Sequence, residues 1–226
     1  FSNIMIENVS KPIILGARRY NKATNELYNS AYFLDENGQI EQIYDKKHLV
    51  PFGEYIPFID FLNVFVETGT ENNGITGFSI GQKPNEISID QFTTVAIFIC
   101  YESIFSNEID KNITKSDLII HLTNDAWFGA YNGPQQHLVQ MRARAIEQGL
   151  SVIRSANTGI SALIDPYGRI LKKIPLNVEG FLDANIPKKL DKTLYSKIGA
   201  VYWNFFLICL FALLYFLCLK RKIKRN

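Results

Sequence analysis

The feature that most limits the possible folds of this chain is an apolar run near its C-terminus. Residues 198–219 read IGAVYWNFFLICLFALLYFLCL and contain no charged side chain. A helix needs about 20 apolar residues to cross a bilayer. A buried core helix is the alternative, but such helices rarely lack charge over this length. The run therefore predicts one transmembrane helix over 198–219.

The tail that follows, KRKIKRN, holds five basic residues and no acidic one. Basic residues beside a span are typical of its cytoplasmic end, and Tyr202 and Trp203 sit near the other end as an interfacial belt would. We therefore expect residues 220–226 to be cytoplasmic. The body would then lie on the opposite side of the membrane, which in a bacterium is the periplasm.

The body is mildly acidic once the tail is set aside. The chain has 24 Lys and Arg, of which 19 lie outside the tail, against 22 Asp and Glu. This slight excess of acidic residues does not indicate a surface that binds nucleic acid. A chain of 226 residues is long enough for one domain with its own core in addition to the span.

Apolar and β-branched runs alternate with helical and loop segments along the body. Asn37-Gly38 between two β-rich runs predicts a hairpin, and Gly133-Pro134 predicts the start of a helix with Leu138, Met141, Ala145 and Leu150 on one face. Buried strands are predicted at 12–19, 93–100, 117–124 and 150–157, and a bent one at 160–174. This pattern predicts an α/β layered fold.

Cys100 ends one of these runs, in AIFICYESIF. Cys209 and Cys218 lie in the predicted span, so Cys100 is the only cysteine of the body. Its thiol has two possible roles, as a small buried hydrophobe or as a nucleophile. The second role requires a positive neighbour or a base, because the thiolate is the reactive form.

Lys46, at the end of another strand, is the candidate positive neighbour. The backbone N–H of Tyr101 would be a second donor to negative charge beside the sulfur. We expect Glu54 and Glu102 to hold Lys46 charged and oriented, because a nearby carboxylate favours the ammonium form. The alternative for each charged residue is a solvated surface position.

These residues lie in motifs that resemble a known family. YDKKHL (44–49) and ICYE (99–102) resemble the lysine and nucleophile motifs of the nitrilase superfamily of carbon–nitrogen hydrolases. A closer resemblance is to the apolipoprotein N-acyltransferase family. It is carried in order by HLVPFGEYIP, ICYES, TNDAWFG, GPQQHLVQMRARAIE and RSANTGISALIDPYG, and then by the terminal span.

The resemblance implies a fold with defined boundaries. Residues 1–190 would form a nitrilase-like α-β-β-α sandwich that lacks its N-terminal part. The transmembrane helix over 198–219 and the basic tail over 220–226 would follow.

The resemblance also implies roles for individual residues. Cys100 matches the nucleophile that takes an acyl chain as a thioester, and Lys46 matches the lysine of the Glu-Lys-Cys triad. Glu54 and Glu102 match acidic residues needed around the site, Tyr101 follows the nucleophile, and Asn29 matches an active-site asparagine.

The implied reaction moves a fatty acyl group from a phospholipid to the N-terminal amine of diacylglyceryl-cysteine in apolipoproteins. The partners would be phospholipid, these lipoproteins and the bilayer, with no cofactor. Three histidines and no Cys/His cluster predict no metal site.

Other side chains remain ambiguous. Trp127 and Phe128 would either line the substrate pocket or pack in the body. The apolar series Phe58, Phe61, Leu62 and Phe65 would be either a lid at the membrane surface or a core-facing helix stripe. Structural hydrogen bonds are expected for His48 and His137. Structural ion pairs, rather than catalytic roles, are expected for Arg142, Arg144 and Glu147.

The family's general base is a glutamate on an earlier strand, in a Pro-Glu motif. Neither Glu7 nor Glu26 lies in a suitable element, so we expect this piece to lack the base and to be inactive alone. Two alternatives stay open: a membrane-tethered amidase that uses water as acceptor, and a non-catalytic remnant of a split gene.

Overall fold

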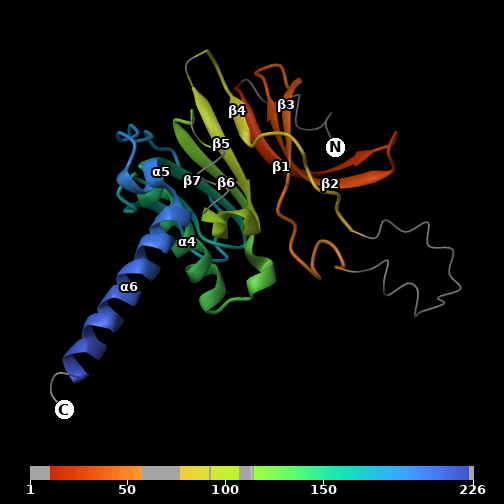
Figure 1. Cartoon of the computed structure of the whole chain (residues 1–226). Coiled ribbons are helices and arrows are strands. Elements are labelled where there is room, and N and C mark those ends of the chain that lie inside the picture. The colour runs from red at the N-terminus through yellow and green to blue at the C-terminus, as the bar shows by residue number, and fades with distance from the viewer. Residues whose placement is uncertain (1–10, 58–76, 92, 107–112, 114, 224–226) are drawn as a thin grey trace, which may run out of the picture.

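The computed structural model describes residues 11–57, 77–91, 93–106, 113 and 115–223. Two sheets and one long helix form the body in layers, and a second long helix, α6, projects away from both sheets (Figure 1). The predicted apolar series over 58–65 and Glu7 lie outside the described residues.

The first sheet is an antiparallel meander of β1 (Ile13–Asn21), β2 (Glu26–Leu34) and β3 (Ile40–Asp45). The predicted hairpin joins β2 to β3, and Gly38 adopts a φ of 73° in its turn. A left-handed φ is freely available to glycine. Strand β3 ends at Asp45, so Lys46 follows directly at the edge of the sheet.

The second sheet has six strands in the order β4-β5-β6-β7-β8-β9. Its central pairs β5–β6 and β6–β7 are parallel, and its outer pairs are antiparallel. The strands are β4 (Glu86–Ser88), β5 (Thr94–Ile99), β6 (Leu118–Asn124), β7 (Ser151–Asn157), β8 (Ser161–Ile164) and β9 (Ile170–Ile174). The bent strand predicted over 160–174 is therefore two strands, joined by the predicted turn at 165–168.

Strand β5 is buried on both faces, because its side chains alternate between two separate clusters. Ala96 and Phe98 join the cluster on the side of α4 (Asn132–Gln148), while Val95, Ile97 and Ile99 join the cluster on the side of the three-stranded sheet. A continuous apolar run is typical of such a strand. The described residues thus form a helix layer and two sheet layers, in agreement with the nitrilase-like fold.

Helix α4 begins near the predicted Gly133-Pro134 start. Leu138, Met141 and Ala145 are buried against the sheet. Gly149 ends the helix at a φ of 68°, and its N–H donates to the Ala145 carbonyl. Leu150 is buried but lies beyond the end of the helix, so its predicted place on the helix face was wrong.

The chain leaves the body through α5 (Leu194–Ile198) and enters α6 (Ala200–Ile223). Thr193 holds this junction to the body, because its hydroxyl donates to the Glu147 carbonyl at the end of α4. Val201–Cys218 is long and apolar enough to cross a membrane and is not buried inside the body. The structure thus contains an apolar helix where the sequence predicts one.

Candidate active site

Cys100 follows the last residue of β5 and begins the short 3₁₀ helix η1 (Cys100–Ile104). Its φ is 50°, in the left-handed region. A residue with a side chain pays roughly 1–2 kcal/mol for this conformation, and such strain is concentrated at functional sites. Cys100 is partly buried and packs against the core cluster on the side of the three-stranded sheet. The strained backbone favours a functional role over that of a small core side chain.

Lys46 lies in a set of polar residues that we call the amine cluster: Asn29, Lys46 and Glu54. The Lys46 side chain is 1% exposed, and its Nζ is 2.7 Å from Glu54 Oε2. The same carboxylate accepts a hydrogen bond of 2.9 Å from Asn29 Nδ2 and one of 2.8 Å from the Val50 N–H. Glu54 thus holds the ammonium group in a fixed position, as predicted, and Asn29 supports Glu54.

Glu102 does not pair with Lys46 in the recorded contacts, and its predicted role as a second ammonium partner was wrong. Its Oε1 accepts hydrogen bonds from Tyr44 Oη at 2.6 Å and the Lys47 N–H at 2.8 Å, and its Oε2 accepts one from the Ile99 N–H at 2.8 Å. The physical reason is local. Glu102 is the third residue of η1, so its carboxylate reaches back to the N–H of the residue before the helix.

This carboxylate brings the two predicted catalytic segments together. Lys47 follows Lys46 and Ile99 precedes Cys100, and one buried carboxylate binds the backbone N–H of both Lys47 and Ile99. The ends of β3 and β5, more than fifty residues apart in the sequence, therefore lie next to each other. Burial raises the pKa of Glu102. The hydrogen bonds from Tyr44 and from the N–H groups of Ile99, Lys47 and His48 oppose that rise.

A second polar set lies beneath Cys100, and we call it the arginine cluster: Ser103, His121, Asp125, His137 and Arg154. All five side chains are buried. Arg154 Nη2 lies 2.5 Å from Asp125 Oδ2, and its Nη1 lies 2.6 Å from His121 Nδ1. Two imidazole nitrogens, His121 Nε2 and His137 Nε2, lie 3.1 and 3.2 Å from the Cys100 carbonyl oxygen.

Electrostatics within the arginine cluster follow from burial and pairing. Burial, and then the Arg154 charge, lower the pKa of His121 well below its usual value, so this imidazole is neutral. Burial alone would raise the pKa of Asp125, but the His137 hydrogen bond and the Arg154 charge outweigh it and lower that pKa. The arginine cluster therefore contains the Arg154–Asp125 ion pair, and a neutral His121 is hydrogen-bonded to Arg154.

His137 makes the structural hydrogen bonds expected of it, whereas no role was predicted for His121 and Arg154. The only available signal was a polar residue inside each of the otherwise apolar runs LIIHLTN and SVIRSAN. Arg144 pairs with Glu147 at 2.8 Å as expected, whereas Arg142 donates to the Gly168 carbonyl and makes no recorded ion pair.

The predicted aromatic residues lie in different surroundings. Phe128, at the end of η2 (Asp125–Phe128), packs its ring 5.1 Å from that of His137, and the Tyr101 ring packs against Phe105 at 5.1 Å. Trp127 is 76% exposed. Glu26 is at the start of β2 and accepts a hydrogen bond from Tyr28, so it does not join the amine cluster.

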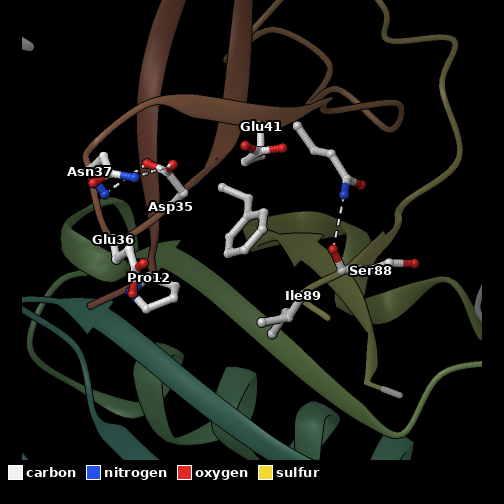
Figure 2. Close-up of a pocket in the computed structure, with 9 residues that line it drawn as sticks. Pro12, Asp35, Glu36, Asn37, Glu41, Ser88 and Ile89 are labelled. Carbon is white, nitrogen blue, oxygen red and sulfur yellow. Dashed lines mark hydrogen bonds between the residues drawn. The ribbon is translucent and has the colours of Figure 1, made fainter. Parts of the chain in front are cut away.

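A shallow depression of about 320 Å³ lies between the β2–β3 turn and the β4 region, lined by Pro12, Asp35, Glu36, Asn37, Glu41, Ser88 and Ile89 among others (Figure 2). Lys46 and Cys100 lie at the opposite ends of β3 and β5 from these residues. The depression is therefore not part of the candidate site. Within the described ranges, no group of three or more His, Cys, Asp or Glu side chains could hold a metal ion.

The strained Cys100 after β5 and the buried Lys46–Glu54 pair after β3 lie in segments that Glu102 joins, within a two-sheet layered fold. The family model for carbon–nitrogen hydrolases matches residues 10–193, and the chain belongs to this family. Among solved structures it resembles a carbon–nitrogen hydrolase from Helicobacter pylori G27. The TM-score is 0.56 at 15% identity, over 75% of this chain and 60% of the other.

Two curated relatives give a more particular likeness. The chain is 42% identical over 193 residues to the apolipoprotein N-acyltransferase of Rhodopseudomonas palustris, covering 84% of this chain and 35% of the relative. It is 45% identical over 175 residues to that of Bradyrhizobium diazoefficiens, covering 77% and 32%. The chain thus spans about a third of the length of these relatives.

Proposed function

We propose that the protein containing this chain transfers a fatty acyl group from a phospholipid to the N-terminal amine of diacylglyceryl-cysteine in apolipoproteins. The observation that carries this proposal is the meeting of the Cys100 and Lys46 segments through Glu102. The names of the relatives supply the substrate class.

The first step makes a thioester at Cys100. The sulfur attacks the ester carbonyl carbon of the phospholipid, and the carbonyl oxygen becomes an oxyanion. Lys46 and the backbone N–H of Tyr101 stabilise this oxyanion. Its collapse breaks the ester C–O bond, and the lysophospholipid leaves with the proton that the thiol has lost.

The second step releases the acyl group to the acceptor. The free amine of the diacylglyceryl-cysteine attacks the thioester carbonyl, the C–S bond breaks, and an amide forms while the thiol regains its proton. Separate donor and acceptor steps through one covalent intermediate predict ping-pong kinetics.

Both substrates are lipids, and α6 gives the site access to them. The helix spans the inner membrane, the body lies on the periplasmic side and the basic tail lies in the cytoplasm. Trp127 and Phe128, in η2, would contact the acyl chains. None of the described carboxylates is assigned as the base for the thiol proton.

The test is intact-mass analysis of the full-length protein incubated with phospholipid while the lipoprotein acceptor is withheld. We expect an acyl adduct on Cys100 that hydroxylamine removes. Cys100→Ala should give no adduct, whereas Cys209→Ala and Cys218→Ala should retain it. Absence of the adduct from the wild-type protein would refute the proposal.

Membership of the carbon–nitrogen hydrolase family favours one other candidate, an amidase that uses water as acceptor. The two differ in substrate. Ammonia release from small amides, with phospholipid left intact, would establish the amidase.

A further inference from the structure

The arginine cluster has no task in the acyl transfer described so far, yet it touches the backbone of the nucleophile. His121 on β6 is the direct register partner of Arg154 on β7, in a parallel pair of strands. Adjacent residues of a ladder place their side chains on the same face. The sheet therefore brings these two polar side chains together under the end of β5.

The hydrogen-bonding groups in this pair allow only one arrangement. A guanidinium group has donors and no acceptor, so His121 Nδ1, which lies 2.6 Å from Arg154 Nη1, must be the acceptor. The proton of the neutral imidazole is then on Nε2. That N–H donates to the Cys100 carbonyl oxygen, 3.1 Å away.

Fixing this carbonyl also fixes the next N–H. The peptide unit between Cys100 and Tyr101 is planar and trans, so its C=O and its N–H point in opposite directions. Because the C=O points inward to the buried histidines, the Tyr101 N–H points the other way. In the proposed mechanism, this N–H donates a hydrogen bond to the oxyanion.

We infer that His121 and Arg154 are positioning residues for acyl transfer. Arg154 selects the Nε2–H tautomer of His121, and this N–H holds the strained Cys100–Tyr101 peptide so that the Tyr101 N–H faces the reacting carbonyl. The inference rests on the proposed function only in requiring that an acyl group is attacked by Cys100.

The pairing explains why a charged residue is tolerated under the nucleophile. Arg154 is fully buried, but its donors are distributed over Asp125, His121 and the Ile160 carbonyl, the last at 3.1 Å. Burial and the Arg154 charge lower the pKa of His121, so the imidazole stays neutral at the pH of the periplasm. The N–H donor is thus constantly present.

Two substitutions at one position separate the two contacts of His121. His121→Asn places its amide oxygen near the Nδ1 position, where it still accepts from Arg154, but its side chain is too short to reach the Cys100 carbonyl. His121→Gln places an amide N–H near the Nε2 position. Both variants are polar and similar in size to histidine. Arg154→Met removes the selection of the tautomer.

The matched control for Arg154 is Arg144→Met. Arg144 is also a buried arginine of the body and pairs with Glu147, but it has no recorded contact with Cys100. We expect this variant to unfold at a lower temperature and to acylate at the wild-type rate.

The experiment uses full-length protein in detergent and measures two reactions at Cys100. The first is the burst of p-nitrophenolate on acylation by a p-nitrophenyl ester, which forms an oxyanion. The second is alkylation by iodoacetamide, which needs the thiolate but forms no oxyanion. Phospholipid acylation is followed in parallel by intact mass, and kcat and KM are measured for each variant.

His121→Asn and Arg154→Met should slow the burst about 10- to 100-fold, because a misaimed oxyanion donor loses part of its effect on the transition state. Alkylation should change by no more than about twofold, since it uses no oxyanion donor. The loss should fall on kcat and not on KM. His121→Gln should recover most of the burst rate.

Wild-type burst rates in His121→Asn, or equal losses of burst and alkylation, would overturn the inference. The proposed function fails separately. If wild-type protein gives the burst but no phospholipid thioester, the acyl donor is wrong and the positioning role stands. If wild-type protein gives no burst while iodoacetamide still alkylates Cys100, both proposals are wrong.

Discussion

The amine cluster, at the end of β3, and the arginine cluster, which contacts the Cys100 carbonyl oxygen, are built differently. In the amine cluster, Lys46 is paired with Glu54, whose side chain retains 11% exposure. In the arginine cluster, the Arg154–Asp125 pair has no exposed side-chain surface at all. Both cations are buried, but the carboxylate of the first pair is partly accessible to water and that of the second is not.

The proposed tasks of the two clusters also differ: the amine cluster stabilises charge on the substrate, and the arginine cluster holds the backbone in place. A carboxylate that keeps some contact with water is partly screened, so its pairing is weaker than that of a fully sealed pair. A charge that only fixes backbone can be buried, where breaking the pair is costly because one ion is left uncompensated. We therefore expect substitutions in the amine cluster to reduce activity more than stability. The arginine cluster should show larger stability losses.

The largest expected effect is that of Lys46→Met. Losing the ammonium removes one proposed donor to the oxyanion, so Cys100 acylation should fall about 10³-fold. The unfolding temperature should also fall, because Glu54 loses its buried partner, but by less than in Asp125→Asn, since Glu54 keeps some contact with water. Lys47→Met is the matched control, because only its backbone N–H binds Glu102. The burst of p-nitrophenolate and the unfolding temperature are the measurements. A Lys46→Met variant that unfolds early but still acylates would reverse the comparison.

Asp125→Asn should produce the next largest effect, which is a decrease in the free energy of unfolding. Arg154 would keep its charge in the interior without a counter-ion, at a cost of about 3–5 kcal/mol in the free energy of unfolding. Asp165→Asn is the control, because Asp165 is equally buried but its partner Arg169 is 70% exposed. Chemical denaturation monitored by fluorescence gives both values. Equal losses in the two variants would show that burial of the arginine does not matter.

Glu102→Gln should have a smaller effect. The carboxylate has no recorded cation partner, and glutamine can keep the hydrogen bonds on one oxygen but turns an amide toward the Ile99 N–H. We expect a loss of about 1–3 kcal/mol in the free energy of unfolding, measured by the same denaturation. A loss as large as that of Asp125→Asn would mean that Glu102 balances a buried charge after all.

The smallest expected effect is in the pH dependence of stability. The pKa of His121 is lowered from 6.5, so only the unfolded state takes up this proton as the pH falls below about 6.5, and the stability contribution of neutral His121 is lost there. Between pH 7 and 5.5, the advantage of wild type over His121→Asn should shrink by about 1 kcal/mol.

Glu102 should respond in the opposite direction. Its pKa is raised above 4.5, so its contribution to stability is present below that pH and is lost as the pH rises. Unfolding measured over one pH series for wild type, His121→Asn and Glu102→Gln would test both signs. The same sign for both residues would contradict the assignment of a neutral imidazole and a partly compensated carboxylate.

Most of the fold was predictable because the signals are local. The run TTVAIFIC predicted β5, Asn37-Gly38 predicted the β2–β3 hairpin, and Pro134 predicted the start of α4. The layered fold follows from such elements, since a strand that is apolar on both faces needs cover on both sides.

The site was predictable only where a short motif carries it. Cys100, Lys46 and Glu54 lie in such motifs, but the partner of Glu102 was wrong because it depends on the reach of a side chain from a 3₁₀ helix. His121 and Arg154 are 33 residues apart in the sequence, and their contact depends on the register of β6 against β7. No local pattern reports that register.

The left-handed backbone at Cys100 has a consequence for how this chain would change over time. Glycine fits that conformation without strain and asparagine with little, so replacing the cysteine by glycine relieves the backbone while abolishing the sulfur chemistry. On this geometry, a chain that made no use of the thiol would gain folding stability by replacing Cys100 with glycine.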